Sequence, residues 1–279
     1  MSATTLVGRP AIPVAPSVAE ARAATRRVAR TFAIACRLLP RQVRDDVYLL
    51  YLVFRTLDDL VDDCRPEAAD RVDAAAAWAH GRRAARTPEI ALLESLSARH
   101  PIPRFAFADF CAGMRQDIAR ATFASEQDLD RYCYRVAGTV GVVMTAILGA
   151  RDPARATPAA AALGMAMQRT NILRDIDEDA ARGRVYLARE TIARHGSPTP
   201  GRRAELLREQ IARADVLYDR GLAGVPELRQ GRRAIAAAGA MYREILREIE
   251  RGGYGAEPGR PAVSRPRKLA VAAWAAGRA

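Results

Sequence analysis

Two stretches of this chain carry aspartates at the same spacing. Asp58 and Asp62 are four residues apart, as are Asp175 and Asp179, and each pair has an arginine on the adjoining turn. Side chains four residues apart share one face of a helix, so each pair forms a small anionic patch. Like charges at this spacing destabilise an isolated helix by roughly 0.2–0.5 kcal/mol per pair. This repulsion indicates that both patches bind a cation.

The residues around the pairs narrow the choice of cation. Leu49, Leu50 and Val53 precede the first pair, and Ile172 and Leu173 precede the second, so the carboxylates lie near faces that should be buried. Carboxylates in such places are costly unless a cation compensates them. Mg²⁺ takes one or two carboxylates and completes its coordination with water and phosphate oxygens. The pattern therefore predicts Mg²⁺ and a diphosphate substrate.

Polar stripes extend both patches along their predicted helices. The first stripe consists of Tyr51, Arg55, Asp58, Asp59 and Asp62. The second consists of Gln168, Asn171, Asp175, Asp179 and Arg182. Each set falls on one side of a helix, which suits residues that face a cavity. The solvated side of an ordinary amphipathic helix gives the same pattern, and spacing alone leaves both readings open.

The remaining sequence predicts an all-α fold. Long stretches lack both proline and glycine, as in 18–39, 43–63 and 67–80, and 129–150 keeps a helical pattern despite its glycines. Alternation of apolar and polar residues over the length of a strand is missing. We expect about eight to ten helices, from typical helix lengths. At 279 residues the chain is expected to form one domain over 18–279, after a flexible segment at 1–17.

Composition argues against several classes of protein. The net charge is +12, but Lys268 is the only lysine, and the arginines are spread along the chain without a nucleic-acid-binding motif. Attraction to anionic lipid headgroups fits this charge better than nucleic acid does. A signal peptide and a run of about 20 apolar residues are both missing. We therefore expect a cytoplasmic protein that can associate peripherally with the inner face of the membrane; the sequence carries no signal of its oligomeric state.

The spacing of the cysteines and histidines argues against disulfide bonds and against a zinc site. The four cysteines have no C-x-x-C spacing and fall in or next to predicted helices: Cys36, Cys64, Cys111 and Cys133. They are expected to be reduced and buried. The histidines form no H-x-x-x-H pattern, which argues against zinc.

Four sequence motifs resemble those of the squalene/phytoene synthase family. The longest runs from Gln168 to Leu187 around the second acidic pair. Three others match in order: Thr31-Phe32 with 37–40, 51–62 around the first acidic pair, and 132–141. The resemblance covers about residues 25–190. It implies a single isoprenoid-synthase domain in which both acidic helices line a central cavity, and a place in carotenoid or hopanoid biosynthesis.

The resemblance also implies a reaction. Family members bind two allylic prenyl diphosphates with Mg²⁺, ionise one, and join the chains head to head through a cyclopropylcarbinyl diphosphate. The expected product is squalene, dehydrosqualene or phytoene, from farnesyl or geranylgeranyl diphosphate. Some members use NADPH without a G-x-G-x-x-G loop, so NADPH is compatible with this sequence but not indicated by it.

Residue roles follow from the match. The implied metal ligands are Asp58, Asp62, Asn171, Asp175 and Asp179. The implied catalytic residues are the four aspartates together with Tyr51, Arg55 and Tyr132. The implied polar contacts to substrate are Arg55, Gln168, Arg174, Arg182, Tyr186 and Tyr254, with Asn171 as a further contact. The prenyl chains and the carbocation need apolar walls, for which the candidates are Phe32, Val136, Ala137, Val140 and Gly141.

Three positions depart from the family pattern. Ala29 stands in a turn that is usually rich in serine, Arg169 replaces a leucine and places an extra charge beside the second motif, and Ala188 replaces a common proline. Gly138 and Gly141 cost a helix roughly 1 kcal/mol each relative to alanine. Either close helix approach or space for a prenyl chain would explain them.

Two other functions remain as alternatives. A class I terpene cyclase would ionise and cyclise a single prenyl diphosphate in the same site. A noncatalytic helical binding protein would keep the fold and lose the reaction. The first differs from a condensing enzyme in product chain length, and the second in releasing no diphosphate.

Overall fold

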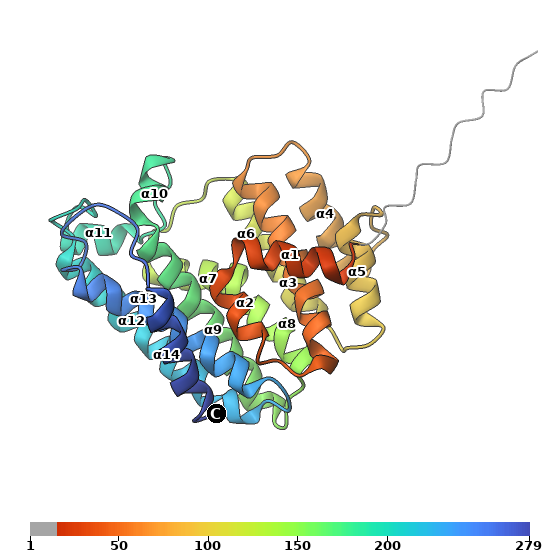
Figure 1. The fold of residues 1–279 in the computed structure, drawn as a ribbon. Helices are drawn as coiled ribbons and strands as arrows, with labels where there is room; N and C mark the ends of the chain where they lie inside the picture. The colour runs from red at the N-terminus through yellow and green to blue at the C-terminus, as the bar shows by residue number, and fades with distance from the viewer. Residues whose placement is uncertain (1–15) are drawn as a thin grey trace, which may run out of the picture.

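The computed structural model describes residues 16–279, which form fourteen α-helices, a π-helix and a 3-10 helix without a β-strand (Figure 1). The helices are α1 (Val18–Val28), α2 (Arg30–Cys36), α3 (Arg41–Asp62), α4 (Ala68–Ala79), α5 (Pro88–Ser97), α6 (Arg104–Ile118), α7 (Glu126–Cys133), the π-helix η1 (Tyr134–Gly138), α8 (Thr139–Leu148), α9 (Pro153–Arg174), α10 (Ile176–Ala181), α11 (Arg189–His195), α12 (Ala204–Ala223), the 3-10 helix η2 (Val225–Glu227), α13 (Arg232–Arg251) and α14 (Arg265–Ala276). The predicted all-α class is confirmed, whereas the predicted number of helices is too small.

The start of the fold agrees with a local sequence signal. Ser17 caps α1: its hydroxyl accepts from the Glu20 amide at 3.2 Å, and the Glu20 carboxylate accepts from the Ser17 amide at 2.6 Å. This reciprocal pair satisfies two amides that the first turn leaves unpaired. α1 thus begins at Val18, where the domain was expected to begin, and residues 1–15 of the predicted flexible segment lie outside the described residues.

Two predicted helices are interrupted, which explains the higher count. The stretch 18–39 divides at Ala29, whose φ of −120° and ψ of 59° are not helical. The stretch 129–150 contains the π-helix η1 between α7 and α8. π-Turns within helices are frequent at functional sites because they displace side chains from the regular 3.6-residue period. Periodicity averaged over a window hides both interruptions.

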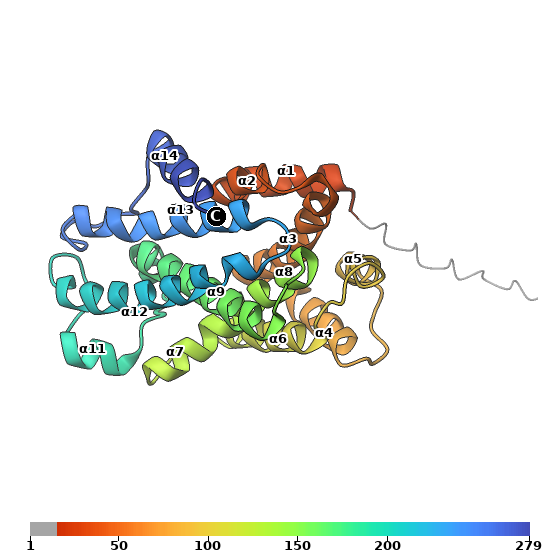
Figure 2. The same ribbon diagram turned by 90° about the horizontal axis from the view of Figure 1, so that it is seen from below.

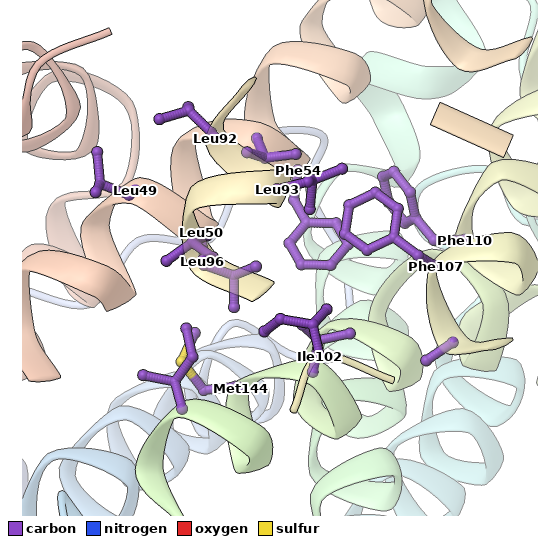
Figure 3. Packing of buried hydrophobic residues seen from close by; sticks show 14 of the residues in the cluster. Leu49, Leu50, Phe54, Leu92, Leu93, Leu96, Ile102, Phe107, Phe110 and Met144 are labelled. Atoms are coloured by element: carbon purple, nitrogen blue, oxygen red, sulfur yellow. The ribbon is translucent and has the colours of Figure 1, made fainter. Parts of the chain in front are cut away.

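The helices enclose two main clusters of buried apolar side chains. The larger packs α3 against α4, α5, α6 and α8, and the rings of Phe54, Phe107 and Phe110 meet there with centroids 4.7–5.9 Å apart (Figure 3). The smaller surrounds the fully buried Tyr218 between α9 and α12. Figure 2 shows α9 near the middle of the molecule, with α12 and α13 on one side and α6 and α8 on the other. α9 is therefore placed to connect both clusters.

Glycines allow α9 to touch its neighbours. A Cβ at Gly141 would lie 2.2 Å from the carbonyl oxygen of Ala160, and one at Gly164 would lie 2.2 Å from the carbonyl oxygen of Ala137. Neither distance is compatible with a methyl group. Of the two explanations offered for Gly141, close helix approach is thus the operative one.

Two further sequence expectations can be checked. Cys36, Cys111 and Cys133 are buried free thiols as predicted, but Cys64 is exposed because it lies in the turn after α3 with a φ of 51°. Among residues 16–279, helices of the length and apolarity that a bilayer span requires do not occur.

Candidate active site

A cavity of about 310 Å³ lies between α2, α3, η1, α8, α9 and α13. All five residues predicted for the apolar wall line it: Phe32, Val136, Ala137, Val140 and Gly141. Six of the predicted polar residues line it too: Tyr51, Arg55, Asp58, Tyr132, Gln168 and Asn171. The cavity thus combines a hydrocarbon-like wall with a polar end, as amphipathic substrates require.

The first acidic motif lies on the uninterrupted helix α3. Asp58 accepts from Arg55 Nη1 at 3.0 Å, and Arg55 also binds Asp59. Asp62 lies one turn further on, outside the cavity lining, and accepts from Arg184 Nη1 at 2.8 Å. Burial, and after it the charge of Asp62, raises the pKa of Asp58 to about 7. Its side chain nevertheless keeps 40% of its accessible surface, which faces the cavity that it lines.

The second acidic motif is built differently from the prediction. α9 ends at Arg174 and α10 begins at Ile176, so Asp175 occupies a break with φ −101° and ψ 10°. One helical turn survives across the break, because the Asp179 amide donates to the Asp175 carbonyl at 2.8 Å. Asp175 and Asp179 therefore remain neighbours, but not on one continuous helix.

Arginines hold the carboxylate of Asp175. Arg174 binds it through Nε at 2.7 Å, and Arg260 from the loop before α14 approaches it through Nε at 2.9 Å. Arg260 lies 85 residues from Asp175 in the chain. The distance in sequence explains why the second motif could not be assigned this partner beforehand.

Electrostatics connect the two motifs. Burial raises the pKa of Asp179 to about 6, followed by the charge of Asp175, and Asp62 contributes to the same rise. Asp62 thus acts on both Asp58 and Asp179. Within residues 16–279, however, three or more carboxylate, histidine or cysteine side chains do not converge closely enough to share an ion. The metal ligands therefore stay a prediction.

The donor set fits Mg²⁺ in two respects. Asn171 lines the cavity beside Gln168, and its Oδ1 is buried without a hydrogen-bond partner. A buried oxygen without a partner is costly, and a cation or a bound hydroxyl would remove that cost. The available donors are carboxylate and amide oxygens, which a hard cation prefers. The residues present are thus compatible with the implied ion.

Asp117 at the end of α6 is a site residue that the sequence analysis missed. It accepts from the hydroxyl of Tyr132 at 3.0 Å and from that of Tyr186 at 3.1 Å. Burial raises its pKa to about 6, while both hydroxyl contacts act in the opposite direction. Tyr186 also accepts from Arg184 at 3.1 Å. Asp117 has no acidic neighbour at helical spacing, so no local signal identified it.

Four of the predicted substrate contacts do not line this cavity. Two of them, Arg174 and Tyr186, bind Asp175 and Asp117 as described above, and the other two are Arg182 and Tyr254. Tyr254 is in the turn after α13, with a φ of 56°, and the Arg208 guanidinium lies 4.5 Å from its ring centroid. It does not line the cavity; Tyr242, within α13, does. Arg182 follows the end of α10, its side chain is exposed, and its charge lowers the pKa of Asp179. The turn after α13 thus places Tyr254 outside the cavity lining. The motifs that resemble the family end near residue 190, so they could not predict this position.

Arg169 is also placed differently from the prediction. Its side chain is 3% exposed and points away from the acidic motifs, where it binds Glu126 at 2.8 Å and Asp130 at 2.7 Å. Gln210 of α12 joins this network by accepting from Arg169 and donating to Glu126. The helix period explains the difference: Gln168 and Asn171 face the cavity, so Arg169 faces the opposite side.

The other two departures have small structural consequences. Ala29 lies at the break between α1 and α2 and lines the cavity, where it offers a methyl group in place of a hydroxyl. Ala188 is fully buried with a φ of −64°, a value that proline also adopts. The backbone at this position is therefore the same as the usual proline would give.

Comparisons with known proteins agree with this geometry. The family model described as squalene/phytoene synthase matches residues 25–267. The chain belongs to the squalene/phytoene synthase family. It is 39% identical over 239 residues to a phytoene synthase of Thermus thermophilus, covering 80% of each chain, and 35% identical over 260 residues to chloroplastic phytoene synthase 2 of Solanum lycopersicum, covering 86% of this chain and 84% of the relative.

A solved structure extends the agreement to the whole fold. A dehydrosqualene synthase in complex with a ligand superposes with a TM-score of 0.84 and 27% identity, over 94% of this chain and 95% of that one. The chain is therefore a prenyltransferase of the family that condenses prenyl diphosphates head to head. The relatives do not favour the terpene cyclase, and because they are prenyltransferases they do not favour a noncatalytic binding protein either.

Proposed function

We propose that this enzyme condenses two allylic prenyl diphosphates head to head in the central cavity, with Mg²⁺ at its polar end. The observation that carries the proposal is the juxtaposition, in one cavity, of Asp58, Arg55 and Asn171 with an otherwise apolar wall. A diphosphate and its prenyl chain would occupy these two parts. The proposed ligands of the ion are Asp58, Asp62, Asn171, Asp175 and Asp179.

The polar end has the groups that departure of diphosphate needs. Mg²⁺, when bound, neutralises the charge that develops on the leaving oxygens. Arg55 already faces the cavity and can turn from Asp58 to a diphosphate oxygen, forming a charge-assisted hydrogen bond. The unpaired oxygen of Asn171 lies at the same end. Arg174 and Arg260 are bound to Asp175 and would form such hydrogen bonds to diphosphate at the second motif.

The apolar end suits a carbocation. The rings of Phe32 and Tyr51 pack with centroids 5.0 Å apart, and both line the cavity. Aromatic faces attract positive charge without acting as nucleophiles. Val136, Ala137 and Val140 complete a wall that excludes water, which would otherwise capture the cation.

We propose geranylgeranyl diphosphate as the substrate and phytoene as the product. The support is that the two curated relatives described above are phytoene synthases at 35–39% identity, compared with 27% for the dehydrosqualene synthase. Neither phytoene nor dehydrosqualene requires a reductant, so the reaction should proceed without NADPH.

Mass spectrometry of products from both substrates, with and without NADPH, tests this choice. A C40 hydrocarbon from geranylgeranyl diphosphate alone supports it, and dehydrosqualene or squalene from farnesyl diphosphate as the preferred reaction contradicts it. A C15 or C20 hydrocarbon product would instead support the terpene cyclase.

We also propose that the enzyme works at the cytoplasmic face of a membrane, where its hydrocarbon product dissolves. α14 supports this: Trp274 is 61% exposed and Leu269 is 47% exposed, and Arg278 stacks on the Trp274 ring at 4.1 Å. Residues 261–279 contain basic side chains and no acidic one. An exposed tryptophan beside arginines is typical of helices that lie in the headgroup region.

Vesicle binding tests the location. Trp274→Ala with Leu269→Ala should reduce flotation with vesicles of phosphatidylglycerol and phosphatidylcholine about tenfold, whereas Phe105→Ala, an exposed aromatic on α6, should not. Equal flotation of both variants would contradict the role of α14.

A further inference from the structure

A second concave site lies outside the central cavity, where α1, α2 and α3 meet. It encloses about 180 Å³, and four of its six lining residues are arginines: Arg22, Arg26, Arg37 and Arg44, with Ala33 and Tyr48. Figure 2 shows α1 and α2 along one edge of the molecule, and α3 packs against α1 beneath them. A hollow lined mainly by guanidinium groups is unusual because like charges repel, and concave surfaces concentrate their field.

The charge of this hollow is largely uncompensated. Among residues 16–279, Asp45 is the one carboxylate that forms an ion pair with any of the four arginines, and it binds Arg22. Arg44 is held by backbone carbonyls, through Nε to Leu39 at 3.1 Å and through Nη2 to Arg37 at 3.3 Å. Arg26 donates to the Arg22 carbonyl at 3.3 Å. Carbonyls orient these guanidinium groups without neutralising them.

An unpaired hydrogen-bond donor in this hollow also indicates an anion site. The Nε of Arg22 is buried and has no hydrogen-bond partner. The floor of the hollow is not a solvated surface, since Ala33 is 9% exposed and Tyr48 is 6% exposed. A planar guanidinium with free N–H groups matches the oxygens of a phosphoryl group.

We propose that this hollow, which we name the arginine pocket, binds a phosphoryl anion, either free diphosphate or the phosphate of a lipid headgroup. It is separate from the diphosphate region of the central cavity. α2 lies between the two, with Ala33 and Arg37 lining the arginine pocket while Ala29 and Phe32 line the cavity. An anion in the arginine pocket would therefore restrain the helix that forms one wall of the active site.

Calorimetry on the full chain tests the pocket, with inorganic pyrophosphate and EDTA so that metal-dependent binding in the cavity is suppressed. Arg26→Gln with Arg37→Gln removes two exposed charges and should weaken binding at least tenfold, since each arginine near a phosphate contributes roughly a fivefold factor. Asp45→Asn removes the opposing charge and should tighten binding several-fold.

A matched control carries the same loss of charge at other exposed sites. Arg41→Gln with Arg82→Gln should keep the affinity of the wild type. Flotation with phosphatidylglycerol vesicles, compared with phosphatidylcholine alone, separates the two sources of phosphate. Loss in the pocket variant of either pyrophosphate or phosphatidylglycerol binding supports the proposal and identifies the source. Equal behaviour of the pocket and control variants in both measurements overturns it.

Discussion

The two acidic motifs share a spacing but not a structure. Asp58 and Asp62 lie on the uninterrupted helix α3, and Asp58 reaches the cavity. Asp175 lies at the break between α9 and α10 and is held by arginines from its own motif and from the loop before α14. Identical spacing therefore produced one preformed cavity face and one face that depends on a distant segment.

The layers behind the motifs differ as well. Phe54, Leu57 and Val61 pack behind the first motif in the apolar core. Behind the second, Arg169 binds Glu126 and Asp130 in a network that reaches α12. Both motifs thus have apolar packing behind them, and the second has directional contacts between charged groups in addition. The predictions below test whether this difference matters for stability and activity.

The largest effect is expected behind the second motif. Arg169→Met leaves the buried Glu126 with the more distant Arg213, 4.0 Å away, as its remaining cationic partner, and breaking a buried ion pair costs about 3–5 kcal/mol. Urea denaturation measures the loss. Adding Glu126→Gln to the same chain removes the buried charge and should restore part of the stability. A loss below 1 kcal/mol for the single variant would show that the network does not support the second motif.

Removing a carboxylate from either motif should lower turnover with little loss of folding. Asp58→Ala and Asp175→Ala are each expected to reduce diphosphate release by roughly 10²-fold or more, the scale of losing one electrostatic stabiliser of a transition state. Asp63→Ala, exposed just beyond the first motif, is the control. Wild-type turnover in one of the two variants would assign the chemistry to the other motif alone.

The burial of Asp58 predicts a pH dependence of stability in EDTA. Its pKa is about 7 in the folded chain and roughly 3.9 in an unfolded one. The stability that the protonated Asp58 carboxyl contributes to the folded chain is therefore fully present below pH ~4 and is lost as the pH rises through about 7. Solvent in the cavity screens this charge, so we expect a change of about 1 kcal/mol. Denaturation between pH 5 and pH 8 should show a smaller decrease for Asp58→Asn; an identical decrease would contradict the prediction.

Arg260 should affect the second motif only modestly. Arg260→Ala removes a cation 2.9 Å from Asp175 and should tighten Mg²⁺ binding to the substrate-free enzyme about threefold, as expected for a partly exposed charge. Titration calorimetry with Mg²⁺ measures this change, and Arg265→Ala, exposed at the start of α14, is the control. Weaker Mg²⁺ binding in Arg260→Ala would mean that the arginine orients Asp175 instead of competing with the ion.

The site could be predicted unevenly from the sequence. The wall residues Phe32, Val136 and Val140, and the polar residues Gln168 and Asn171, all line the cavity as expected. Asp117 and Tyr242 were not predicted, and Tyr254 does not line the cavity, because their positions depend on how α6 and α13 pack and where α13 ends. Arg169 was expected only to place a charge beside the second motif, and its contacts with Glu126 and Asp130 depend on how α7 packs against α9.

The sequence alone determined the all-α class, the family, the two acidic pairs and part of the cavity wall, because these depend on local period and on long motifs. The tertiary structure decided what each carboxylate contacts. Asp175 meets Arg260, Asp62 meets Arg184, and Asp117 meets two tyrosines from later segments. Such contacts join residues far apart in the chain, and charge acts through space, so spacing along the sequence cannot specify them.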